Sequence, residues 1–207
     1  FFNFANGFIS LRYYSFHRFS NCFLISQIMV HKRLQIIIKL IDKRNPGGNI
    51  EPADLVLTDP VEVRYRPPGE EGGERDEPLQ QAIVDIADQA EHAVHEKTVV
   101  LVLSDHLIPK HELPVHAALA TGAVHHHLVR NHDRTRIGLV LESGEAREVH
   151  HHCLLIGYGA DAINPYLAFE ALFQAKRDGL LSADEYPNDD SIVADYRKGV
   201  VKGMFKV

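Results

Sequence analysis

The sequence has 207 residues, of which 45% are hydrophobic and 24% are charged, and a formal net charge of −6 at pH 7. This composition suits one globular domain, and the acidic balance argues against nucleic acid as the main partner, because phosphate binding needs a basic face. Two cysteines, Cys22 and Cys153, are too few for a disulfide framework or a four-cysteine metal site. No apolar run reaches the roughly 18 to 20 residues of a membrane span. We expect a reducing compartment, the cytoplasm or a plastid.

Residues 1–50 differ in composition from the rest of the chain. They hold seven of the ten phenylalanines, without the period of a strand or a helix. We interpret them as an atypical N-terminal extension, either artefactual or disordered. Two alternatives stay open: a transit peptide, because the segment contains Arg and Ser and is poor in acids, and a basic amphipathic helix over residues 27–43 that would suit a membrane surface.

Residues 55–96 are predicted to form a strand, a loop and a helix. Residues 55–65 read as a strand, with Pro60 marking either an edge position or a break, and residues 66–78 read as an exposed, Gly/Pro-rich loop. Residues 77–96 are predicted to form an amphipathic helix with Pro78 in its first turn. Its apolar stripe consists of Leu79, Ile83, Ile86, Ala90, Ala93 and Val94.

Two short apolar runs, Thr98 to Leu103 and Ile137 to Leu141, predict strands that are buried on both faces. Between them, residues 111–130 predict a helix with Pro114 near its start. The inward-facing residues of that helix are expected to be Val115, Leu119, Gly122, Ala123 and Leu128.

The chain then alternates helix and strand to its end. Ser143 is predicted to be the N-cap of a helix that runs to about Ile156 and ends at the glycine-containing segment 157–159. A short strand is expected at residues 161–163. Two further helices are expected at residues 166–177 and 188–207.

Repeated strand–helix units predict an α/β fold with a parallel sheet, either a partial barrel or an open sheet. The carboxyl ends of parallel strands meet at one edge of the sheet, where α/β folds place their sites. Four polar residues are predicted to lie at that edge, as interface or strand-end positions: Asp105, Glu142, Ser143 and Asn164.

The residues favour a structural role over a catalytic one. Asp105, Glu142 and Asn164 would also suit an acid, a base and an orienting amide, but capping and loop hydrogen bonds are the commoner use of these residue types. Twelve of the fourteen histidines lie in residues 92–152, yet neighbouring residues on a helix point about 100° apart, so a triplet of histidines does not converge on one ion. Cys153 is expected to be a small buried thiol. We assign no catalytic, cofactor-binding or metal-binding residues.

One long block has a specific resemblance to a known family. Residues 123–172, AVHHHLVRNHDRTRIGLVLESGEAREVHHHCLLIGYGADAINPYLAFEAL, closely resemble the central domain of the large subunit of glutamate synthase. The resemblance extends upstream through TVVLVLSD and downstream to DYRKGVVKGMFKV, and covers about residues 54–207. The sequence departs from the family in two places. LSDHLIP stands where the family has Arg-Gly after the Asp, and HHHC stands where the family has an aromatic residue after two histidines.

The resemblance implies a fragment of an enzyme that transfers the amide nitrogen of glutamine to 2-oxoglutarate, with reduction, to give two glutamates. Residues 51–187 would be the central domain, and residues 188–207 the start of a truncated connection to the flavin domain. The family's N-terminal cysteine nucleophile, FMN and iron–sulfur cluster fall outside this span, as does its electron donor, ferredoxin or a nicotinamide. The expected partners are the glutaminase and flavin domains, which this domain spaces apart while it helps to form the ammonia passage.

Two alternatives to that interpretation remain. One is a His-rich, metal-dependent hydrolase. The other is a non-functional truncated remnant, whose severed domain interfaces would expose apolar patches and lower its solubility.

Overall fold

The computed structural model describes residues 59–67 and 77–207, all of which belong to a single compact unit. The predictions made for residues 1–50, and for most of the loop at 66–78, lie outside the described residues. Within the described part of the chain, no helix has both the length and the apolar character to cross a membrane.

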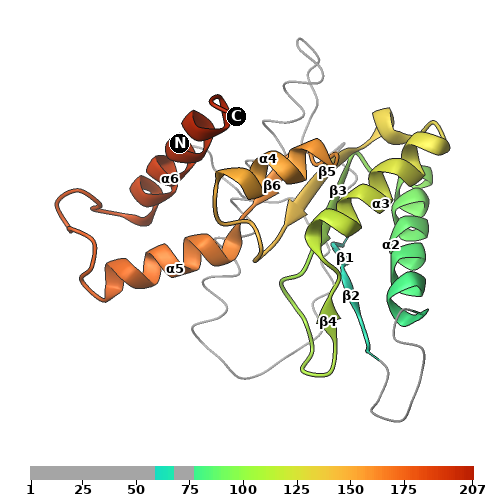
Figure 1. Ribbon diagram of the computed structural model, residues 1–207, viewed down its shortest axis with the longest axis horizontal. Coiled ribbons are helices and arrows are strands. Elements are labelled where there is room, and N and C mark those ends of the chain that lie inside the picture. Colours follow the sequence, from blue (N-terminus) through green and yellow to red (C-terminus); the bar gives the residue numbers. More distant parts are fainter. Residues whose placement is uncertain (1–58, 68–76) are drawn as a thin grey trace, which may run out of the picture. The chain divides into compact units, whose positions relative to one another are not determined.

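The centre of this unit is a parallel four-stranded sheet, as the sequence predicts (Figure 1). Its strands, in spatial order, are β1 (Val61–Glu62), β3 (Val100–Ser104), β5 (Gly138–Glu142) and β6 (Ala162–Asn164). Among the described strands β1 lies at the edge, and it begins directly after Pro60, so the described residues agree with either effect expected of this proline. The spatial order follows the chain order without a reversal, which is how strands succeed one another in the wall of a barrel.

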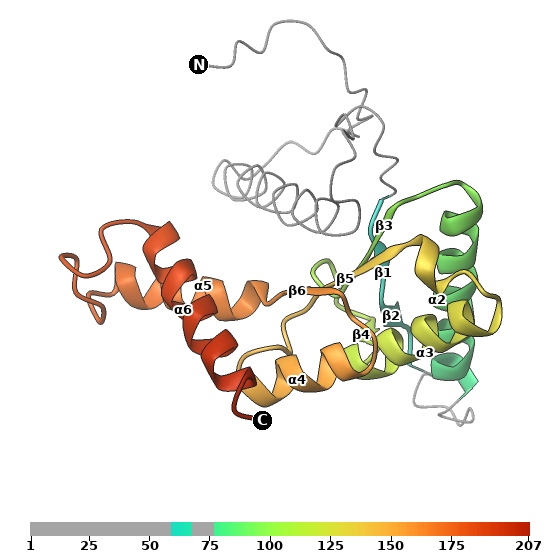
Figure 2. The same ribbon diagram turned by 90° about the horizontal axis from the view of Figure 1, so that it is seen from above.

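The helices that connect these strands lie together. They are α2 (Glu77–His95), α3 (Ala117–Arg130) and α4 (Val149–Gly157), and a 3-10 turn, η2 (Arg134–Arg136), precedes β5. Right-handed crossovers between strands in unreversed order place every connecting helix on one face of the sheet. Contacts between α2 and α3, and between α3 and α4, agree with this arrangement, and Figure 2 shows α3 and α4 on one side of the strands.

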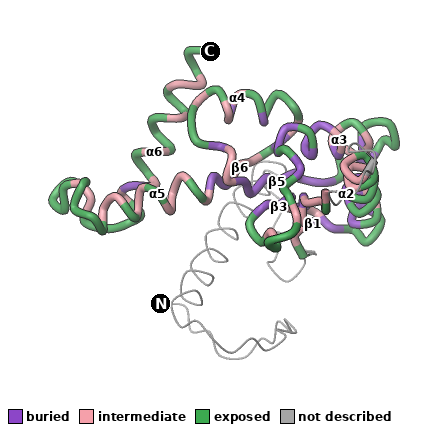
Figure 3. The backbone as a smooth tube through the Cα atoms, turned by 60° about the horizontal axis from the view of Figure 1, so that its bottom comes forward, coloured by how far each residue is buried: buried purple, intermediate pink, exposed green. Residues whose placement is uncertain are grey.

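The core lies between this helical layer and the sheet. Side chains alternate along a strand, so Leu101, Leu103, Leu139 and Leu141 all point to the same face, and each is 0% exposed. They pack with the apolar stripe predicted for α2, whose members Ile86, Ala90 and Val94 are also buried. Figure 3 shows the buried residues gathered on β3, β5 and the inner sides of the helices.

The start of α3 corrects the prediction of a helix from residue 111. α3 begins at Ala117, and the preceding residues form β4 (Leu113–Pro114), which pairs antiparallel with β2 (Arg64–Tyr65). The residue before a proline is pushed out of the helical region, so this segment is extended. Leu119, predicted to face inward, is 42% exposed, while Val115 and Leu128 are buried as expected.

The C-terminal part of the chain adds two helices, α5 (Tyr166–Arg177) and α6 (Asp189–Met204). α5 has the bounds that the sequence predicts. α6 begins after Asn188, whose side chain accepts a hydrogen bond from the Ser191 N–H at 2.9 Å and so caps the helix. α6 packs against α4 and α5.

Four of the described helices end in the same type of turn. In each, the residue after the cap has a positive φ, and the last two N–H groups of the turn bond back into the helix, as in a Schellman motif. After α4, for example, the Ala160 N–H donates to the Leu155 carbonyl at 3.1 Å. This confirms the helix end predicted at residues 157–159. The left-handed residues are Lys97, His132, Gly159 and Gly179.

Candidate functional site

The predicted strand-end residues meet at the carboxyl edge of the sheet. The parallel register pairs Ser104 with Glu142, and Glu142 with Asn164, so the three residues form a row across β3, β5 and β6. Because side chains alternate, this row points to the face opposite that of Leu103 and Leu141. The strand register therefore places one carboxylate between a hydroxyl and an amide.

Glu142 is the centre of this row. Its side chain is almost fully buried, with 1% exposure. Ser104 Oγ donates to Glu142 Oε2 at 2.6 Å, and Asn164 Nδ2 donates to Glu142 Oε1 at 3.1 Å. Both carboxylate oxygens thus accept hydrogen bonds from neighbouring strands, which is how a buried charge is kept tolerable.

Asp105 forms a second group just beyond the row. Its N–H donates to the Glu142 carbonyl at 3.2 Å, which continues the ladder between β3 and β5. Its carboxylate accepts from Ser143 Oγ at 2.8 Å and from the Gly144 N–H at 3.0 Å. Asp105 therefore holds the loop that leaves β5.

Ser143 has a different role from the predicted one. The helix after β5 begins at Val149, and the residue that precedes it, Glu148, makes no side-chain cap. Ser143 Oγ instead accepts from the Glu145 N–H at 3.1 Å, within the loop, and donates to Asp105. The prediction of a helix N-cap at Ser143 is wrong because the same hydroxyl is used to turn the loop.

Tyr166, the first residue of α5, completes the site and was not predicted. Its hydroxyl bonds to the Asp105 carboxylate, and burial, together with the nearby Asp105 charge, raises the pKa of the Tyr166 phenol. The His106 ring lies edge-on to the Tyr166 ring at 4.5 Å. No local motif marks this tyrosine, because only the fold brings the start of α5 back to the end of β3.

We call this set the polar rim: Ser104, Asp105, Glu142, Ser143, Asn164 and Tyr166. It ties the ends of three strands to the β5–α4 loop and to α5 through hydrogen bonds among its own side chains and backbone. Asp105, Glu142 and Asn164 lie together at one edge of the sheet. The carboxylate oxygens of Asp105 and Glu142 accept hydrogen bonds from the chain's own donors, an arrangement that fixes loop geometry.

The histidine triplet on α3 contacts several different partners, as the helix geometry predicts. Arg134 Nε donates to His125 Nδ1 at 3.0 Å, while His127 Nε2 lies 2.6 Å from Glu91 Oε2. Burial, and then the Arg134 charge, lower the pKa of His125. The same arginine also bonds the carbonyls of Ile137 and Gly159, so it fastens the turn that precedes β6.

Cys153 is more exposed than predicted. It is a free, half-buried thiol rather than a fully buried one. It lines an open hollow of about 620 Å³ on α4, together with His150, His151, Leu154, Gly157 and Tyr158.

Comparison with known proteins points to one family. The glutamate synthase central domain family matches residues 18–207. The glutamate synthase [NADPH] large chain of Bacillus subtilis (strain 168) is 41% identical over 131 residues, which make up 63% of this chain and 8% of that protein. The glutamate synthase [NADH] of Schizosaccharomyces pombe is 42% identical over 126 residues, 61% of this chain and 6% of that protein. The ferredoxin-dependent glutamate synthase of Antithamnion sp. is 34% identical over 133 residues, 60% of this chain and 9% of that protein.

The chain thus spans less than a tenth of the length of each of these relatives. The family match begins at residue 18, earlier than the resemblance read from the sequence, which begins at about residue 54. Because the match covers most of the sequence, the chain belongs to the glutamate synthase central domain family.

Proposed function

We propose that this chain works as the connecting domain of a glutamate synthase. In such an enzyme a glutaminase domain releases ammonia from glutamine, and a flavin domain uses it to convert 2-oxoglutarate into glutamate with reduction. The chain would hold the two domains at a fixed separation and form part of the wall of the ammonia passage. The enzyme would act in ammonia assimilation and glutamate biosynthesis, in the cytoplasm or in a plastid.

Family membership over residues 18–207 is the observation that carries this proposal. The polar rim supports it, because a spacer needs strand-end loops whose shape does not change when neighbouring domains bind. Asp105 and Glu142 are 7% and 1% exposed, and both accept hydrogen bonds from the chain itself. In this proposal they fasten loops for docking, and the neighbouring domains carry out the bond-making.

The cofactors of the proposed enzyme would be bound by its other domains. Iron–sulfur clusters are held by several cysteine thiolates, usually four, whereas this sequence has 2 cysteines in total. The donor set therefore does not fit a cluster. FMN would be held by the flavin domain.

Assays of the purified chain test the proposal. We expect neither glutaminase activity nor glutamate formation from 2-oxoglutarate, because both reaction centres belong to other domains. Substantial turnover by the chain without other subunits would contradict the proposal. A second assay uses a full-length glutamate synthase that is inactive because its matching segment has been deleted. Recovery of glutamine-dependent activity when this chain is inserted in place of that segment would support the proposal.

A further inference from the structure

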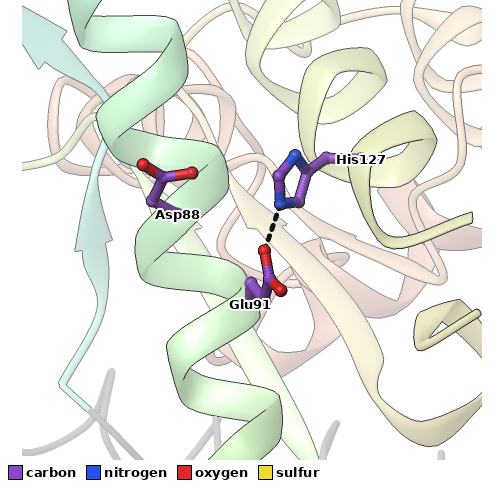
Figure 4. Close-up of side chains that lie close together, drawn as sticks. All are labelled: Asp88, Glu91 and His127. Atoms are coloured by element: carbon purple, nitrogen blue, oxygen red, sulfur yellow. Dashed lines mark hydrogen bonds and ion pairs between the residues drawn. The ribbon is translucent and has the colours of Figure 1, made fainter. Parts of the chain in front are cut away.

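A cluster of potential metal ligands lies away from the polar rim, where α2 packs on α3 (Figure 4). Asp88 and Glu91 are three residues apart on α2, a spacing that puts both carboxylates on one side of the helix. His127 reaches them from α3. Each of the three residues offers one ligand atom, and these atoms all lie within 4.8 Å of one another.

We propose that Asp88, Glu91 and His127 form a binding site for a divalent transition-metal ion, with Zn²⁺ as the ion that fits best. One imidazole nitrogen and two carboxylate oxygens are common zinc ligands. An ion with bonds of about 2.1 Å in tetrahedral geometry holds its ligand atoms about 3.4 Å apart, so small side-chain rotations suffice to close the site. The two carboxylates also balance the charge of the ion.

The placement of the three residues favours a bound ion. The side chains of His127 and Glu91 are 23% and 33% exposed, and Asp88 is exposed, so the ligands are held against the helices while one side stays open to water. A three-ligand site with an open position is a familiar zinc arrangement. The packing of α2 on α3 holds the ligands before the ion arrives.

The hydrogen bonds at the cluster involve two of its three residues and leave the exposed carboxylate of Asp88 accessible to an ion. Glu91 and His127 are joined at 2.6 Å, and Asn131 Nδ2 lies 3.2 Å from the same His127 nitrogen. Asp88 makes no hydrogen bond or ion pair with any described residue, although its carboxylate lies beside that of Glu91. An ion would neutralise both carboxylates at once. The Asn131 amide, turned by 180°, would present an oxygen to the same point.

The ligand types predict which metal ions the site prefers. Imidazole nitrogen favours Zn²⁺ over Mg²⁺ and Ca²⁺, which prefer oxygen ligands. A metal ion bound at His127 Nε2 would take the place of the hydrogen bond between His127 and Glu91. This inference does not depend on the proposed enzymatic role.

The test is a calorimetric titration of the untagged, full-length chain with Zn²⁺ in excess Mg²⁺. We expect His127→Ala and Glu91→Gln each to lower the Zn²⁺ affinity of one class of binding site by about tenfold or more. Asp88→Asn should lower the affinity of the same class. His126→Ala is the matched control, because His126 is the exposed neighbour on the same helix, and it should leave that class unchanged. The other histidines of the chain contribute a background that all variants share.

A second measurement covers variants that fold poorly. An ion that bridges α2 and α3 stabilises the folded state, so Zn²⁺ should raise the unfolding temperature of the wild type and of His126→Ala. The same addition should have no such effect on Asp88→Asn or Glu91→Gln. Equal Zn²⁺ binding and equal Zn²⁺-induced stabilisation in the wild type and all three ligand variants would overturn the proposal. Competition by Mg²⁺ at the same site would also overturn it.

Discussion

At the scale of single residues, the polar rim depends on how completely its two carboxylates are hydrogen-bonded. Asp105 accepts from Ser143 Oγ, from the Gly144 N–H and from the Tyr166 hydroxyl. A buried acceptor that loses a donor keeps the full cost of its desolvation, which exceeds the net gain of an average hydrogen bond. Small changes at the rim should therefore be costly.

Ser143→Ala tests this cost directly. The substitution removes the hydroxyl that donates to Asp105 at 2.8 Å and changes the side-chain volume very little. It should therefore lower the free energy of unfolding by about 1–3 kcal/mol. Urea denaturation measures the difference. Ser182→Ala, at an exposed position whose side chain makes no hydrogen bond to a described residue, should stay within about 0.5 kcal/mol of the wild type. Equal losses at both positions would mean that the bond to Asp105 does not matter.

Tyr166 gives the rim a dependence on alkaline pH. Because the folded state raises its pKa, the unfolded chain releases the Tyr166 proton first as the pH increases. The contribution to stability is complete below the ordinary tyrosine pKa of about 10 and is lost progressively above it. Wild-type stability should thus fall more steeply above about pH 10 than that of Tyr166→Phe.

The control for this measurement is Tyr158→Phe, since Tyr158 is 47% exposed. Its unfolding curves between about pH 9 and 11 should follow those of the wild type. The argument about Tyr166 fails if Tyr166→Phe shows the same alkaline slope as the wild type.

At the scale of elements, α6 is docked onto α4 by a close approach of its last turn. A Cβ on Gly203 would press into the side chain of Val149, whose β-branched shape leaves it little freedom to move. Gly199, one turn earlier on the same helix, would place a Cβ in open space. The two glycines therefore separate helix propensity from packing.

Alanine substitutions at these glycines should have opposite effects on stability. Gly199→Ala should stabilise the chain by up to about 1 kcal/mol, because alanine favours a helix interior over glycine. Gly203→Ala gains the same propensity but overpacks the contact with Val149, and should cost about 1–3 kcal/mol. Thermal or urea unfolding of both variants checks this. A stabilising Gly203→Ala would show that α6 does not rest on α4.

The elements that sequence could predict are those whose signals are local. The predicted bounds of α5, Tyr166–Arg177, are correct, and this helix carries local signals, with Pro165 before its start and basic residues in its last turn. The strands β3 and β5 were predictable as short apolar runs. The start of α3 was not, because residues 113–114 adopt their conformation by pairing with Arg64 and Tyr65, a distant segment.

The residues of the site also divide into those that local sequence could predict and those that depend on distant contacts. Asp105, Glu142, Ser143 and Asn164 were predictable as strand-end residues, because the carboxyl ends of parallel strands share an edge. Tyr166 was not, since its contact with Asp105 exists only once the start of α5 lies beside the β5–α4 loop. The cluster of Asp88, Glu91 and His127 was missed for a similar reason: the helix packing that joins it leaves no mark in the spacing of the histidines.

At the scale of the whole molecule, the chain matches only a small share of its much longer relatives. It covers 8% of the Bacillus subtilis large chain, and its described residues form a four-stranded parallel sheet with helices packed beside it. The proposal gives this domain a positioning role. Its contribution should therefore be visible only when the glutaminase and flavin domains are joined through it.

The most direct measurement compares glutamine-dependent glutamate formation by three proteins. They are the isolated chain, a Bacillus subtilis large chain that lacks the matching segment, and a chimera in which this chain replaces that segment, the last two with the remaining subunit present. The account predicts no activity for the first two proteins and restored activity for the chimera. Glutamate formation by the isolated chain, or full activity in the protein that lacks the segment, would contradict it.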